Sequence, residues 1–173
     1  MRRIRNALPF LLAATVAGAH SASDAYLTLS VVAGSKTDGS TLHGQWDIAL
    51  RDLDFVLKLD DDGDGQVTWG ELKRHQAAIE RYAFSRLRFT DEAGTSCSLR
   101  PARQLIDAHA DGAYAALFFN VVCAHAAKSL TMNYGLFFAI DPSHRGIFVM
   151  RSGANTSTAV LSPQNGKVVL KLD

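Results

Sequence analysis

The sequence lacks the short motifs that identify several large classes of enzyme. It contains no GxSxG elbow for a nucleophilic serine. No glycine-rich phosphate loop is predicted, because Gly63 and Gly65 belong to an acidic stretch described below. The two cysteines are widely separated, so neither a thioredoxin-like CxxC motif nor a zinc ribbon is indicated. These absences favour a protein that is not an enzyme.

Paired histidines are also missing from the sequence. Transition-metal sites often use two histidines with a short fixed spacing on one helix or one strand. We find no such pair, and we interpret the histidines as scattered solvent-facing or capping residues. They are His20, His43, His75, His109, His125 and His144.

The body of the chain has neither a basic excess nor a long apolar run. The formal net charge of the whole sequence, +1, gives no indication of a nucleic-acid partner or of binding to an anionic membrane. The longest apolar stretch, Ala113 to Ala127, contains Asn120 and His125 and is shorter than the roughly 20 residues that a membrane span needs. We therefore expect no transmembrane segment there.

The first 19 residues are typical of a signal peptide. Three arginines open the chain, and the 13 residues from Ala7 to Ala19 are mostly apolar but too few to span a bilayer. Small residues at Ala17 and Ala19 favour cleavage after Ala19, with alternative sites up to Ala22. We predict an exported protein, periplasmic or extracellular, whose formal charge becomes −2 once the three arginines are removed.

The stretch Asp60–Glu71 has the spacing of a twelve-residue EF-hand calcium loop. Gly65 occupies the position where such a loop turns sharply, and we expect Val67 to point back into the fold. Thr68 would reach the ion directly or through a water. The predicted metal ligands are Asp60, Asp62, Asp64, the backbone carbonyl of Gln66, Thr68 and a bidentate Glu71.

An acidic turn that only stays solvated is the alternative interpretation of this loop. We favour calcium because every ligand position is filled and the glycine is in place. Mg²⁺ needs a tighter octahedron, and Zn²⁺ prefers cysteine or histidine, neither of which lies in the loop. Ca²⁺ is the predicted cofactor, and we find no second loop of this kind.

Alternating apolar residues predict strands on both sides of the loop. Ala25–Val32 and Leu42–Leu50 precede it, and Leu130–Ile140 is the clearest of several that follow. The predicted class is α+β, mostly β: an antiparallel β-sandwich over residues 23–173 with a helix–calcium loop–helix inserted at 47–82.

The two cysteines are predicted to form a disulfide. Cys97 shares a face with Leu99, and Cys123 shares one with Val121 and Phe119, so both thiols point into the predicted core. An oxidising compartment permits a bridge between them. Two inert buried thiols are the alternative.

A charged turn, Asp141-Pro142-Ser143-His144-Arg145-Gly146, follows the clearest strand. We interpret it as structural. Convergence of Asp141, His144 and Arg145 around a pocket would instead favour an enzyme with a structural calcium.

Several segments resemble the exported amino-terminal region of bacterial HupE/UreJ-type membrane proteins, which are associated with nickel and cobalt transport. In those proteins, transmembrane helices follow the position at which this sequence reaches Asp173. The resemblance implies an extracytoplasmic calcium module that is either part of a membrane protein or stands alone. It does not imply that this protein transports metal ions. The matching segments are Ser23-Asp24-Ala25-Tyr26-Leu27-Thr28-Leu29, Trp46-Asp47-Ile48-Ala49-Leu50-Arg51-Asp52-Leu53-Asp54, Asp111-Gly112-Ala113-Tyr114 and Leu136-Phe137-Phe138-Ala139-Ile140-Asp141-Pro142-Ser143-His144-Arg145-Gly146.

The expected function is therefore calcium binding by an exported, non-enzymatic domain in which calcium has a structural role. Two alternatives stay open: an extracytoplasmic regulatory module with a permease-like membrane-protein partner, and an enzyme that needs calcium only for its structure. The sequence does not indicate an oligomeric state.

Overall fold

The structure is a computed structural model, and it describes residues 23–32 and 40–172. The predicted signal peptide and its cleavage sites lie outside the described residues. The elements in chain order are β1 (Asp24–Val31), β2 (Thr41–Ala49), α1 (Leu50–Leu57), α2 (Trp69–Phe84), β3 (Leu87–Asp91), β4 (Ser98–His109), β5 (Gly112–Val122), β6 (Ser129–Tyr134), β7 (Arg145–Ser152), β8 (Asn155–Leu161) and β9 (Lys167–Lys171).

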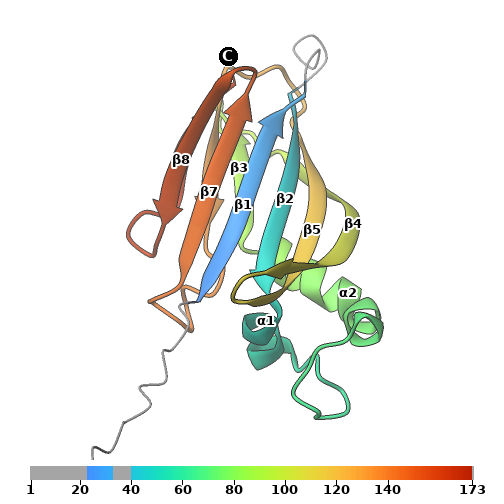
Figure 1. Cartoon of the computed structure of the whole chain (residues 1–173). Coiled ribbons are helices and arrows are strands. Elements are labelled where there is room, and N and C mark those ends of the chain that lie inside the picture. Colours follow the sequence, from blue (N-terminus) through green and yellow to red (C-terminus); the bar gives the residue numbers. More distant parts are fainter. Residues whose placement is uncertain (1–22, 33–39, 173) are drawn as a thin grey trace, which may run out of the picture.

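The strands form two sheets, which confirms a mostly β fold. Six strands lie in the order β4-β5-β2-β1-β7-β8, and three lie in the order β3-β6-β9; Figure 1 shows the larger sheet in front. The prediction of a purely antiparallel arrangement is wrong at one place, because β1 and β7 pair in parallel. Most of the chain separates these two strands, and a connection of that length permits parallel pairing.

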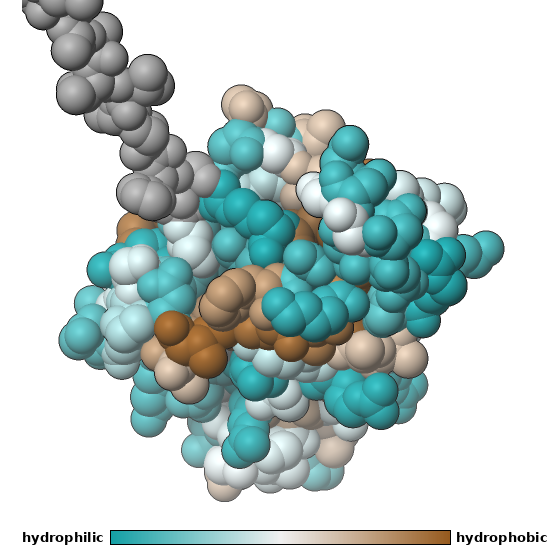
Figure 2. Space-filling view, turned by 90° about the horizontal axis from the view of Figure 1, so that it is seen from below, coloured by the Kyte–Doolittle hydropathy of each residue, from teal (hydrophilic) through white to brown (hydrophobic). Residues whose placement is uncertain are grey.

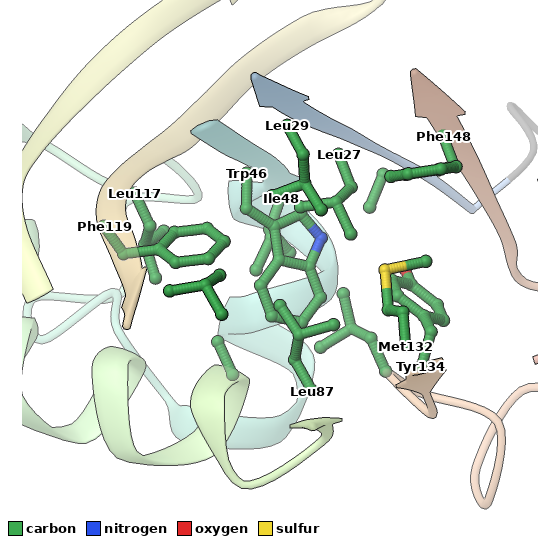
Figure 3. Packing of buried hydrophobic residues seen from close by; sticks show 14 of the residues in the cluster. Leu27, Leu29, Trp46, Ile48, Leu87, Leu117, Phe119, Met132, Tyr134 and Phe148 are labelled. Carbon is green, nitrogen blue, oxygen red and sulfur yellow. The ribbon is translucent and has the colours of Figure 1, made fainter. Parts of the chain in front are cut away.

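One apolar core joins the two sheets. Alternation along each strand directs one set of side chains inward, and on β1 and β2 these include Leu27, Leu29, Trp46 and Ile48. The indole of Trp46 lies against the ring of Tyr134 from β6, with ring centroids 5.5 Å apart. Figure 3 shows these side chains meeting between the sheets.

The clearest predicted strand, Leu130–Ile140, is a strand only as far as Tyr134. Beyond it the backbone turns: Phe137 has a φ of 56°, and its carbonyl accepts hydrogen bonds from the N–H groups of Ile140 and Asp141. Leu136 and Phe137 are both buried although they are adjacent, so the alternation of a strand has ended. The sequence after Tyr134 has the apolar pattern of a strand because the side chains of this turn also pack on the core.

The two helices are inserted between β2 and β3. Helix α1 begins at the residue after β2, and only two residues separate α2 from β3. Both helices lie at one end of the large sheet (Figure 1). They are anchored by apolar side chains, among which Leu53, Leu72 and Ile79 are fully buried. No described helix is long and apolar enough to cross a membrane.

The predicted disulfide is confirmed: Cys97 and Cys123 are bonded. Cys97 immediately precedes β4 and Cys123 immediately follows β5, so the bond ties together the open ends of this antiparallel pair. Cys123 is buried in the core, as the alternation along β5 predicts. Inert buried thiols are thereby excluded.

We predict that replacing both cysteines with alanine lowers the free energy of unfolding by about 3.5 kcal/mol on the chain-entropy model. The bond closes a loop with a sequence separation of 26, and the unfolded chain gains freedom without it. Urea denaturation of both proteins measures the change. A reducing agent should lower the stability of the wild type by a similar amount and leave the double variant unchanged. Equal midpoints for both proteins would contradict the prediction.

Candidate metal centre

The acidic loop Asp60–Glu71 connects α1 to α2. Two of its glycines have positive φ angles, 74° at Gly63 and 85° at Gly65. An added Cβ would meet no atom within 4 Å at either position. The backbone conformation, and not a lack of space, therefore requires glycine at these two turns.

The carboxylate of Asp60 organises the first half of the loop. Its Oδ1 accepts hydrogen bonds from the N–H groups of Gly63 and Asp64, at 2.8 and 3.2 Å, and its Oδ2 accepts one from Gly65 at 2.8 Å. Asp62 Oδ1 accepts from the N–H of Asp64, and Asp64 Oδ1 accepts from that of Gln66. These hydrogen bonds between backbone N–H groups and nearby carboxylates hold the loop backbone in its turns.

Glu71 closes the loop from the first turn of α2, where it is only 2% exposed. Its Oε1 accepts from the N–H of Asp61 at 2.9 Å, and its Oε2 accepts from the N–H and hydroxyl of Thr68, both at 2.8 Å. Thr68 in turn caps the helix by accepting from the N–H of Glu71. The hydrogen bonds from Thr68 hold the pKa of Glu71 below its usual range, so the carboxylate stays charged.

Three predicted ligands come together in the structure. Asp60, Asp62 and Glu71 each offer one oxygen, and these oxygens lie within 4.8 Å of one another. Asp64 is outside this trio, and the hydroxyl of Thr68 is engaged in the helix cap. A donor set made only of oxygens, several of them charged, fits a hard cation such as Ca²⁺.

Electrostatic repulsion is concentrated at Asp62, on which the charges of both Asp64 and Glu71 act. The pKa of Asp62 is lowered by the hydrogen bond from the Asp64 N–H, but the charges of Asp64 and Glu71 together with desolvation outweigh that bond, so the pKa is raised overall. A bound cation would relieve this repulsion directly.

Three residues outside the loop hold it in position and were not identified from the sequence: Asp54, Arg74 and His75. Asp54 Oδ1 accepts from the N–H groups of Leu59 and Asp60, which fixes the end of α1 against the first predicted ligand, Asp60. Asp61 is held by Arg74 and His75 of α2 at 2.8 Å each. The hydrogen bonds from His75 and Arg74 lower the pKa of Asp61. The unusual polarity of α2 at His75 was the sequence signal for this contact.

The loop adjoins the turn between β4 and β5. A cleft of about 430 Å³ separates them, lined on one side by residues that include Asp60 and Gln66 and on the other by residues that include Asp111 and Tyr114. One side of the acidic loop therefore lies beside the large sheet, while residues 61–66 are exposed to solvent.

The charged turn after β6 does not form a convergent site. Arg145 donates to the backbone carbonyls of Pro142 and His144, while Asp141 accepts from the N–H and hydroxyl of Ser143. The side chains of Asp141, His144 and Arg145 thus each face a different partner. This agrees with the structural interpretation of the turn.

The prediction that the histidines are solvent-facing or capping is wrong for His144, which is fully buried. Its Nδ1 lies 2.7 Å from Ser23 Oγ and its Nε2 lies 2.9 Å from Tyr134 Oη. Ser23 donates its own proton to Asp52, so Nδ1 must be the protonated nitrogen and Tyr134 donates to Nε2. The neutral ring ties Tyr134 of β6 to Ser23, which precedes β1, and Ser23 in turn is bonded to Asp52 of α1.

No protein-family model matches this chain, and no curated protein matches it either. The functional interpretation therefore rests on the residues and their geometry.

We predict that His144 makes the protein less stable in mild acid. Burial lowers the pKa of His144 to about 4, whereas an unfolded histidine titrates near 6.5. Unfolding therefore takes up a proton between these values, and this stability is present above pH 6.5 and lost as pH falls toward 4. The slope attributable to His144 should approach about 1.4 kcal/mol per pH unit.

Urea denaturation between pH 7 and pH 4.5 measures this effect. His144→Gln should show a shallower decline than the wild type, whatever its stability at pH 7. His125→Gln is the matched control, because His125 is exposed. A decline of equal slope in all three proteins would refute the assignment.

Proposed function

We propose that this protein is a calcium-binding domain in which Asp60–Glu71 is the loop of a single EF-hand inserted in a β-sandwich. The observation that carries the proposal is the approach of Asp60, Asp62 and Glu71 to within 4.8 Å of one another. The backbone bonds to Asp60 and the helix cap at Glu71 support it, since they hold these carboxylates in place. Asp64, the Gln66 carbonyl and Thr68 complete the proposed shell.

Calcium has a structural role in this proposal. A sensor EF-hand must move its helices apart and uncover an apolar groove. Here α1 continues directly from β2, and α2 leads into β3 after two residues. The ion pair from Arg74 and the hydrogen bond from His75 to Asp61 also fasten the loop to α2. These restraints favour a calcium ion that orders the loop over one that opens the helices.

The proposed location is outside the cytoplasm, in the periplasm or the extracellular space. The disulfide supports it, because such bonds persist in oxidising compartments. A signal peptide over residues 1–19 would deliver the chain there. Export also agrees with the weak calcium affinity expected of extracellular modules.

A second candidate function is partner binding beside a permease-like membrane protein, as the resemblance to the HupE/UreJ-type exported region implies. One observation favours it: Phe55 and Ile140 are 70% and 50% exposed, and both line a shallow cleft with Phe137. Figure 2 shows apolar side chains gathered near the middle of the face that is seen from below. An apolar surface of this kind is typical of contact sites.

We predict one calcium site of the weak extracellular class, with a Kd of roughly 10⁻⁴ to 10⁻³ M. A single loop lacks the partner loop that preorganises most EF-hands. With free calcium at ten times Kd, the free energy of unfolding should rise by about 1.4 kcal/mol. Calorimetric titration measures the affinity, and thermal unfolding measures the stabilisation.

Glu71→Gln should abolish this binding. Glutamine can keep the reciprocal helix cap through its one carbonyl oxygen, but it removes the bidentate carboxylate and the acceptor for the Asp61 N–H. Glu80→Gln, on the same helix and outside the loop, is the matched control and should bind as the wild type does. A nanomolar site, an absence of heat at millimolar calcium, or unchanged binding by Glu71→Gln would overturn the proposal.

We further predict that calcium slows hydrogen exchange only within about residues 52–82. An ordering role stiffens the loop and the adjoining helix ends without exposing apolar surface. Exchange measured with and without calcium, on the wild type and on Glu71→Gln, tests this. Faster exchange around Phe55 and Phe137 on calcium addition would instead identify a sensor, and would favour the partner-binding candidate.

A further inference from the structure

A second group of metal-ligating side chains lies on the outer face of the large sheet, close to the turn between β4 and β5 that adjoins the acidic loop. It consists of Asp47 on β2 and of Asp107 and His109 on β4, and one ligand atom from each lies within 4.8 Å of the others. Strand β5 runs between β2 and β4 in the sheet. The side chains meet because β4 curls at its end and carries the turn to β5 across the front of the sheet (Figure 1).

Asp47 is the buried member of this group, at 8% exposed. Both of its oxygens accept from Gln45 Nε2, at 2.9 and 3.1 Å. A neutral amide orients the carboxylate but does not balance its charge. Among the described residues, no lysine or arginine forms an ion pair with it. A buried carboxylate in this position is stabilised by a neighbouring cation.

His109 faces this carboxylate with its ring fixed in place. The ring stacks on Tyr114 at a centroid distance of 4.1 Å and also contacts Tyr26 at 5.1 Å. Tyr114 is itself held by a hydrogen bond from its hydroxyl to Asp111. These contacts preorganise the imidazole, as the surroundings of metal-binding histidines usually do.

The separation of the two groups suits a shared ion. His109 Nε2 lies 3.7 Å from Asp47 Oδ2, which is too long for a hydrogen bond. Two ligand atoms, each about 2.1 Å from one metal ion, stand roughly 3 to 4 Å apart. Asp107 is exposed, and although its Oδ1 accepts from the N–H of Ala108 at 2.9 Å, its carboxylate can complete the third position from the solvent side.

We propose that Asp47, Asp107 and His109 form a second metal site, selective for a divalent transition metal of the Zn²⁺ type. One imidazole nitrogen with two carboxylates suits borderline ions, whereas calcium takes oxygen ligands alone. Gln45 is a positioning residue that holds Asp47. The site leaves coordination positions for water or for a ligand of a partner, and it does not depend on the calcium proposal.

Calorimetric titration of the purified chain with Zn²⁺, in excess Ca²⁺ to fill the acidic loop, tests the site. One ion should bind per chain. Gln45→Ala should weaken binding about tenfold, as the loss of an outer-shell partner does. His109→Ala and Asp107→Ala should each weaken it by more than about 100-fold, beyond any outer-shell effect.

His125→Ala is the matched control, because its side chain is exposed and outside the group. It should bind as the wild type does. Asp107 and His109 are preferred for substitution over the buried Asp47, and circular dichroism checks that each variant is folded. The His109 ring signals should also shift on Zn²⁺ addition in NMR spectra. An absence of binding at millimolar Zn²⁺, or binding that survives His109→Ala, overturns the proposal.

Discussion

The alternation of side chains along β2 is the constraint on which the rest of the structure depends. A strand directs neighbouring residues to opposite faces, so Trp46 points into the core while Asp47 points to the outer face of the sheet. The same strand pairs with both β1 and β5 and continues without a linker into α1. Its register therefore fixes the core, the outer cluster and the approach to the acidic loop together. A slip of one residue would exchange the two faces and lose all three.

The two candidate metal centres handle buried negative charge in different ways. At Glu71, backbone N–H groups and a hydroxyl donate to both oxygens, so the carboxylate is well solvated by the protein before any ion arrives. At Asp47 only the amide of Gln45 donates, and this neutral group does not balance the negative charge of the carboxylate. A bound cation or a protonated His109 would balance it. The first arrangement belongs to a continuous segment, and the second is assembled from strands distant in the sequence.

This difference explains how much could be predicted from the sequence. The acidic loop and its candidate ligand residues follow from local spacing, and the disulfide follows from the faces of Cys97 and Cys123. The group of Asp47, Asp107 and His109 was missed because the curl of β4 creates it, and no local pattern reports that curl.

The other errors have the same origin. The parallel pairing of β1 with β7 depends on the path of the whole chain. The turn after Tyr134 kept an apolar spacing because its side chains still enter the core. The sequence places His144 in a turn, and its burial could not be predicted from that position. It is buried because Tyr134 and Ser23 pack against its ring in the folded structure.

The bond between Cys97 and Cys123 makes β4 and β5 a closed covalent ring, with the disulfide at one end and the turn before Gly112 at the other. A protease that cuts the exposed turn would therefore open the ring without dividing the molecule. The two fragments would stay joined through the bridge and through the pairing of the two strands. In an environment rich in extracellular proteases, such a nicked chain would keep its sheet and its core.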